Sequence, residues 1–157
     1  MPIPYPHQGI WRKLARAPIW LYRWRLGWLL GKRFLLLEHR GRKSGRTYHT
    51  VVEVVHHDPS TDTYYVVSGF GKRADWFRNI QVHPDVFITV GQRRMPALAR
   101  VLPVDEGTRV LSAFMKRHPK EIEMLGRMFG YPPIRSEEDV RNFVAEHPVV
   151  AFTVKRE

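Results

Sequence analysis

The chain has 157 residues, of which 43% are hydrophobic and 12% aromatic, so it is long enough to bury a core and its composition excludes disorder of the whole chain. It contains no cysteine, which excludes disulfide, thiol-nucleophile and thiolate-metal chemistry. The 26 Lys and Arg residues outnumber the 15 Asp and Glu residues, for a formal charge of +11. This charge favours polyanionic partners such as nucleic acid, anionic lipid or a phosphorylated cofactor.

The first thirty residues combine prolines, tryptophans and cationic side chains. We expect residues 1–9 to be a flexible N-terminus and residues 10–157 to form a single domain. Residues 10–30 predict an amphipathic helical region, either two helices or one helix kinked at Pro18, with apolar side chains on one side and cations on the other. The apolar side either packs on the domain's own core or contacts an anionic membrane surface. We find no secretory signal and expect a cytoplasmic location, with peripheral attachment to the inner face of the membrane as the alternative.

Beyond residue 31 the chain follows the pattern of strands joined by turns. Stretches rich in β-branched and aromatic residues predict strands over residues 34–39, 48–57, 63–68, 86–90, 95–104 and 149–154. Helices are predicted over residues 76–82, 106–118, 119–129 and 137–146, with Asp75, Asp105 and Ser136 as N-caps of the first, second and fourth. Antiparallel strands with helices at the ends indicate an α+β barrel or sheet rather than a βαβ fold.

The most informative motif is the run Gly-Arg-Lys-Ser-Gly-Arg at residues 41–46, between the first two predicted strands. Glycines let the backbone approach a ligand closely, so this turn can direct N–H groups and cationic side chains at one anionic group such as a phosphate. It is not a Walker A loop, because that motif needs a glycine directly before its lysine, and here Arg42 precedes Lys43. The alternative is a basic turn that is simply solvated.

Four motifs in the same order resemble the deazaflavin-dependent nitroreductase family of split β-barrel proteins. They are residues 41–45 after an aliphatic strand, residues 65–69 before a glycine loop, residues 75–80 with the sequence Asp-Trp-Phe-Arg-Asn-Ile, and residues 83–85 with the sequence His-Pro-Asp. The resemblance implies an α+β split β-barrel of antiparallel strands with an N-terminal amphipathic helix region and C-terminal helices. It also implies binding of the deazaflavin coenzyme F-420, with FMN as the alternative cofactor.

The family's site residues carry over to this chain position by position. The cofactor-binding residues implied are Arg42, Lys43, Ser44, Gly45, Arg46, Ser68, Gly69, Lys72, Trp76 and Asn79. The tyrosines expected to contact the substrate are Tyr48, Tyr65 and Tyr131. The implied activity is hydride transfer from the reduced cofactor to a small acceptor such as a quinone, nitroarene or enone. Such a reaction needs no protein nucleophile and no metal.

Parts of the sequence are also compatible with other functions. A split-barrel protein that binds flavin, lipid or haem without catalysis would have the same barrel. A basic nucleic-acid-binding module is the rival from another class, although neither a zinc finger nor the aromatic motifs of RNA-recognition sheets occur. His49, His56 and His57 match no metal-ligand spacing, so we expect no metal. A homodimer is compatible with the sequence.

Overall fold

The computed structural model describes residues 34–120, 123, 127 and 134–156. The predicted amphipathic region at residues 10–30, most of the helix predicted over residues 119–129, and Tyr131 lie outside the described residues.

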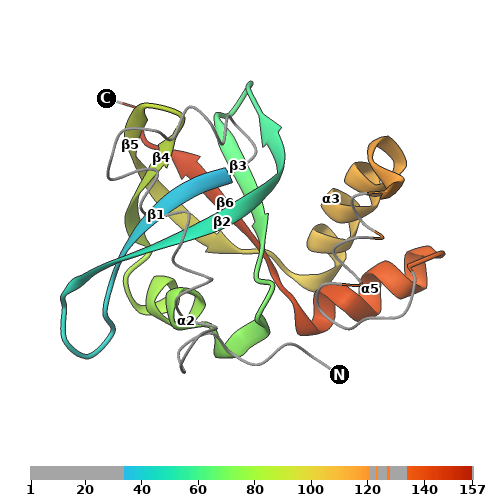
Figure 1. Ribbon diagram of the computed structural model, residues 1–157, viewed down its shortest axis with the longest axis horizontal. Helices are drawn as coiled ribbons and strands as arrows, with labels where there is room; N and C mark the ends of the chain where they lie inside the picture. The colour runs from blue at the N-terminus through green and yellow to red at the C-terminus, as the bar shows by residue number, and fades with distance from the viewer. Residues whose placement is uncertain (1–33, 121–122, 124–126, 128–133, 157) are drawn as a thin grey trace.

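Six antiparallel strands form a closed barrel in the order β1-β2-β3-β6-β5-β4 (Figure 1). The strands are β1 (Phe34–Arg40), β2 (Thr47–Asp58), β3 (Thr63–Val67), β4 (Asp85–Val90), β5 (Arg93–Val101) and β6 (Val149–Val154). Strand β1 pairs with both β2 and β4, and β6 lies between β3 and β5. The predicted α+β split β-barrel is confirmed.

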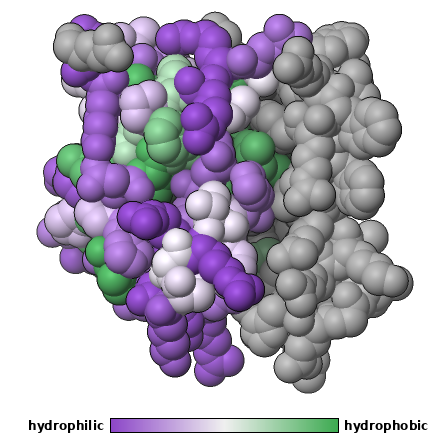
Figure 2. All heavy atoms as spheres, turned by 90° about the vertical axis from the view of Figure 1, so that its left-hand side faces the viewer, coloured by the Kyte–Doolittle hydropathy of each residue, from purple (hydrophilic) through white to green (hydrophobic). Residues whose placement is uncertain are grey.

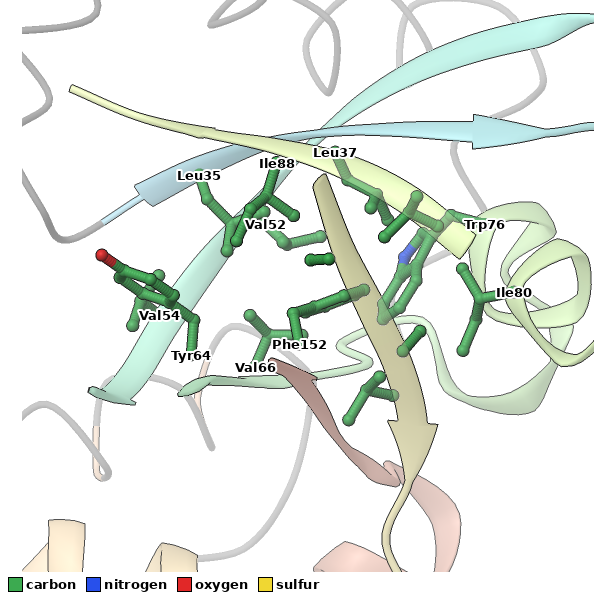
Figure 3. Packing of buried hydrophobic residues seen from close by; sticks show 14 of the residues in the cluster. Leu35, Leu37, Val52, Val54, Tyr64, Val66, Trp76, Ile80, Ile88 and Phe152 are labelled. Atoms are coloured by element: carbon green, nitrogen blue, oxygen red, sulfur yellow. The ribbon is translucent and has the colours of Figure 1, made fainter. Parts of the chain in front are cut away.

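Alternation along the strands fills the barrel with apolar side chains. On β1, Leu35 and Leu37 are fully buried, and on β3 the alternate residues Tyr64 and Val66 are buried. Phe152 of β6, also fully buried, packs near the centre of this core (Figure 3). The barrel interior is therefore a packed core with no room for a cofactor at its centre.

The helices occupy two places around the barrel (Figure 1). Helix α2 (Asp75–Val82), preceded by the short 3-10 helix η3 (Gly71–Arg73), lies at one end and inserts Trp76 and Ile80 into the core (Figure 3). Helices α3 (Val104–Arg117) and α5 (Glu137–Glu146) pack together beside the barrel, where they form a second apolar cluster with residues of β2 and β6. None of the described helices is long and apolar enough to cross a membrane.

One of the three predicted helix caps is confirmed and two are wrong. Ser136 caps α5 in a capping box with Asp139. Helix α2 instead begins after Ala74 and α3 after Pro103, neither of which makes a side-chain cap. Asp75 and Asp105 therefore lie in the first turns of these helices, where a negative charge is favourable without a capping bond.

Candidate functional site

The basic turn, residues 41–46, closes the hairpin between β1 and β2 and projects beyond the barrel (Figure 1). The Gly41 N–H donates to the Arg46 carbonyl at 2.7 Å, and the Gly45 N–H donates to the Gly41 carbonyl at 2.9 Å. Gly45 has a φ of 71°, a left-handed conformation that favours glycine. At Gly41 the requirement is space, because a Cβ there would lie 2.5 Å from Ser44 Oγ. Both glycines are thus needed for this one turn shape.

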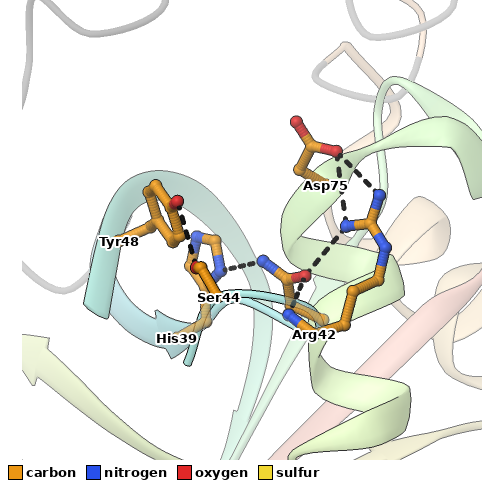
Figure 4. Close-up of polar contacts among 6 residues, drawn as sticks. His39, Arg42, Ser44, Tyr48 and Asp75 are labelled. Carbon is orange, nitrogen blue, oxygen red and sulfur yellow. Dashed lines mark hydrogen bonds and ion pairs between the residues drawn. The ribbon is translucent and has the colours of Figure 1, made fainter. Parts of the chain in front are cut away.

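Asn79 of α2 ties the basic turn to the end of the barrel by binding Arg42, whose side chain extends toward Asp75 in Figure 4. Its Oδ1 accepts hydrogen bonds from the Arg42 backbone N–H at 3.0 Å and from Arg42 Nη1 at 2.9 Å. The Arg42 guanidinium also lies 3.5 Å from Asp75 Oδ1. Asn79 is buried and both bonds are partly buried, which limits the competition from water. Arg42 is therefore held by α2 rather than left free for a ligand.

His39, which is not among the site residues predicted from the sequence, completes this network. Its Nδ1 lies 3.0 Å from Asn79 Nδ2, and its ring stacks on Tyr48 with 6.0 Å between the ring centres. Burial, and secondly the nearby His49, lower the pKa of His39 to about 4, so the imidazole is neutral at physiological pH. Its position in the sequence could have identified it. His39 continues the inward alternation of Leu35 and Leu37, where a polar side chain is unusual.

The remaining polar groups of the basic turn are largely uncommitted. The side chains of Lys43 and Arg46 are exposed, and neither has an ion-pair partner among the described residues. The backbone N–H groups of Lys43 and Ser44 likewise have no acceptor within the described part of the chain. Ser44 Oγ accepts from the Arg46 N–H at 3.2 Å and lies 3.3 Å from the Tyr48 hydroxyl. Two cations and two N–H donors therefore remain available to an anion.

The glycine loop after β3 is held by bonds within the protein. Ser68 is fully buried, and its hydroxyl donates to the Gly71 carbonyl at 2.6 Å. Its carbonyl lies 3.1 Å from His147 Nδ1, which must carry the proton because a carbonyl only accepts. Gly69 is partly exposed and Lys72 is exposed. Ser68 thus fixes the loop, whereas Gly69 and Lys72 are reachable from solvent.

The predicted aromatic residues do not gather in one place. Trp76 is buried in the barrel core, with its ring 6.3 Å from that of Phe152. Tyr48 lies in β2, two residues after the basic turn, and is 39% exposed, so it is accessible to a ligand. Tyr65 packs instead with the second apolar cluster, beside α3 and α5. The structure therefore brings Tyr48, but not Tyr65, together with the basic turn.

The surface around the basic turn is strongly hydrophilic. Figure 2 shows the face toward which the β1–β2 hairpin projects, covered mostly by hydrophilic side chains with small apolar patches between them. The exposed cations of this region are Arg40, Lys43, Arg46, Lys72, Arg73 and Arg78. Asp75 is the acidic residue of α2 in this region, and it already contacts Arg42. An anionic ligand would meet little repulsion here.

A closed antiparallel barrel with a basic, glycine-bounded turn at one end defines a split-barrel protein suited to an anionic cofactor. The chain belongs to the F420H(2)-dependent quinone reductase family, whose model matches residues 16–123. This confirms the predicted family relationship, and the family's name specifies reduction of quinones with the reduced deazaflavin cofactor.

One relative is a protein of Mycobacterium tuberculosis (strain ATCC 25618 / H37Rv), whose name assigns it provisionally to the F420H(2)-dependent quinone reductases. It is 36% identical over 78 residues, which cover 48% of this chain and 64% of that protein. The matched part thus spans less than two thirds of that relative's length.

Solved structures share the fold at low identity. A structure described as an F420-H2 dependent reductase has a TM-score of 0.52 at 18% identity, covering 78% of this chain and 95% of that one. An FMN-binding protein related to pyridoxamine 5'-phosphate oxidase, from Nostoc punctiforme PCC 73102, has a TM-score of 0.54 at 16% identity, covering 96% and 83%. A chain described as a domain-swapped dimer has a TM-score of 0.53 at 17% identity, covering 87% and 99%.

Proposed function

We propose that the protein is a reductase that uses reduced coenzyme F-420 to reduce a quinone-type small molecule. In such a reaction the acceptor gains a hydride from the cofactor and a proton from solvent, so that a quinone becomes a hydroquinone and the cofactor is oxidised. The observation that carries the proposal is the set of uncommitted donors on the basic turn, in a chain that belongs to a family defined by this cofactor.

The donor set of the basic turn fits the cofactor's anionic phosphate and tail. Lys43 and Arg46 offer charge, and the N–H groups of Lys43 and Ser44 offer directed hydrogen bonds to an oxyanion. Arg42 would contribute mainly by holding the turn, because its guanidinium is bonded to Asn79 and Asp75. Gly69 and Lys72, accessible beside the buried Ser68, would line the next part of the cofactor site.

The protein's own contribution to the reaction would be binding and orientation. Bound reduced deazaflavin supplies the hydride, so no side chain has to act as a nucleophile. Tyr48 is exposed at the start of β2, beside the basic turn, and is the described tyrosine best placed to contact an acceptor; Tyr131 lies outside the described residues. Trp76 and Asn79 would support the site from the core rather than touch the ligand.

Titration with F-420, FMN and FAD, followed by turnover of menadione with the reduced cofactor, tests the proposal directly. We expect F-420 to bind and FMN and FAD not to bind. Tight FMN binding without F-420 binding would overturn it.

Two variants test whether the basic turn binds the anionic part of the cofactor. Lys43→Ala and Arg46→Ala should each weaken F-420 binding by about 1–3 kcal/mol, the usual contribution of a charged hydrogen bond. Lys116→Ala removes the same charge from the exposed last turn of α3 and serves as the matched control, with unchanged affinity. Equal affinities in all three variants would reduce the basic turn to a solvated loop.

Three further points are proposals of their own. We expect a cytoplasmic protein, testable by cell fractionation, and a homodimer, testable by analytical ultracentrifugation. Contact of residues 10–30 with an anionic membrane surface predicts sedimentation with anionic liposomes. That sedimentation should weaken in high salt and disappear when residues 1–30 are deleted.

A further inference from the structure

The hydrogen bonds around Asn79 have only one consistent set of donors and acceptors. Both groups that Arg42 presents to Asn79, the backbone N–H and Nη1, can only donate, so the amide oxygen must face them. The amide nitrogen therefore faces His39, and it too can only donate. His39 Nδ1 must then be the acceptor, which requires the neutral tautomer that carries its proton on Nε2.

We infer that His39 is a positioning residue for the cofactor-binding turn: its unprotonated Nδ1 fixes the Asn79 amide so that Asn79 Oδ1 holds Arg42. The inference rests on the proposed function for what the basic turn binds, but the relay from His39 through Asn79 to Arg42 is a property of the protein alone. With Arg42 held in this way, the side chain of Lys43 and the backbone N–H groups of Lys43 and Ser44 have no competing partner within the described residues. The relay thus preorganises the turn before a ligand arrives.

The surroundings of His39 keep it in the accepting state. Among the described residues, the titratable groups that face it are His49, whose charge opposes protonation, and Asp75, whose charge favours it. Tyr48 stacks on its ring, and Asn79 faces Nδ1. Burial outweighs the attraction of Asp75, since the pKa of His39 is lowered. A proton on Nδ1 would place two donors against each other and force the amide of Asn79 to turn away from Arg42.

Imidazole nitrogen NMR on the protein without cofactor tests the first half of the relay. The wild type should show His39 as the Nε2–H tautomer from pH 6 to pH 8. Asn79→Asp replaces the donating nitrogen by an accepting oxygen of the same size, so His39 should then carry a proton on Nδ1. A wild-type spectrum with the proton on Nδ1 would overturn the inference, and so would an unchanged tautomer in Asn79→Asp.

A pair of His39 variants of similar size tests the effect on the turn. His39→Asn keeps an acceptor near the position of Nδ1, whereas His39→Leu removes it. We expect the Arg42 amide to exchange with solvent about tenfold faster in His39→Leu, and F-420 to bind about tenfold more weakly, the equivalent of one lost hydrogen bond. His39→Asn should recover both quantities to within about threefold of the wild type.

Thr108→Val is the matched control, because it removes a buried hydroxyl that bonds within α3, away from the basic turn. It should lower the melting temperature without changing Arg42 exchange or F-420 affinity. Equal exchange and affinity in His39→Leu and His39→Asn would overturn the inference. If the wild type does not bind F-420, the proposed function fails, while the tautomer and the Arg42 exchange rates still decide whether the relay exists.

Discussion

Replacing Gly41 by alanine tests how tightly the basic turn is built. A Cβ at this position would lie 2.5 Å from Ser44 Oγ and 2.8 Å from Tyr48 Cε2, both shorter than any normal contact. Ser44 Oγ must therefore move, and it would lose its bond to the Arg46 N–H at 3.2 Å and its contact with the Tyr48 hydroxyl at 3.3 Å. Each such hydrogen bond contributes about 1 kcal/mol, so the free energy of unfolding should fall by about 2 kcal/mol.

Urea denaturation measures this loss, with the free energy extrapolated to zero denaturant. Gly45→Ala is the comparison, because nothing lies within 4 Å of a Cβ there and only its φ of 71° is strained. It should cost about 1 kcal/mol. In a Ser44→Ala background, Gly41→Ala should cost less, since one of its two clashes is gone. A loss below about 0.5 kcal/mol for Gly41→Ala would refute the reasoning, because it would mean that the turn relaxes freely.

Three further predictions concern stability. The pKa of His39 is lowered from 6.5 to about 4, so the unfolded chain binds more protons than the folded protein between these pH values. The free energy of unfolding should therefore be constant above about pH 6.5 and fall by up to about 3 kcal/mol as the pH is lowered to 4. Urea titrations across this range should show a smaller fall in His39→Asn than in the wild type, and an identical fall would contradict the assignment. Ser136→Ala removes the capping box of α5 and should cost about 1 kcal/mol by thermal unfolding, whereas Glu137→Ala, outside the box, should cost less. Arg94→Lys loses the two-pronged pair with Glu38, at 2.7 and 3.0 Å, and should cost about 0.5 kcal/mol because Arg94 is 55% exposed; this difference should shrink in 1 M NaCl, and an effect independent of salt would argue against an ionic origin.

Local pattern was sufficient to predict the strands and the basic turn. Alternation of apolar residues locates β1 through β6 to within a few residues, because each strand has one face in the core. The closure of the barrel was beyond such reasoning, since the pairing of β1 with β4 depends on contacts between distant segments. The caps of α2 and α3 were misplaced by one residue or more because an acidic residue suits both a cap and a first turn.

The different roles of the residues in the basic turn could be told apart only from the structure. In the sequence, Arg42 and Lys43 are equivalent cations. In the structure only Arg42 is hydrogen-bonded to Asn79, which lies thirty-seven residues further along the chain. The same applies to Tyr65: its burial depends on α3 and α5, which pack on the outer face of its strand. His39 was overlooked because nothing local links it to Asn79, forty residues further along the chain.

The place of β6 in the sheet has a consequence for synthesis on the ribosome. Thr63 of β3 bonds to Thr153 of β6, its partner in the register, and these two residues are 90 positions apart. The barrel therefore cannot close until residues 149–154 have emerged, and until then β3 and β5 each present an unpaired edge. Nascent chains would carry the basic hairpin on an open sheet, which makes this interval the period of greatest exposure to aggregation or to chaperones.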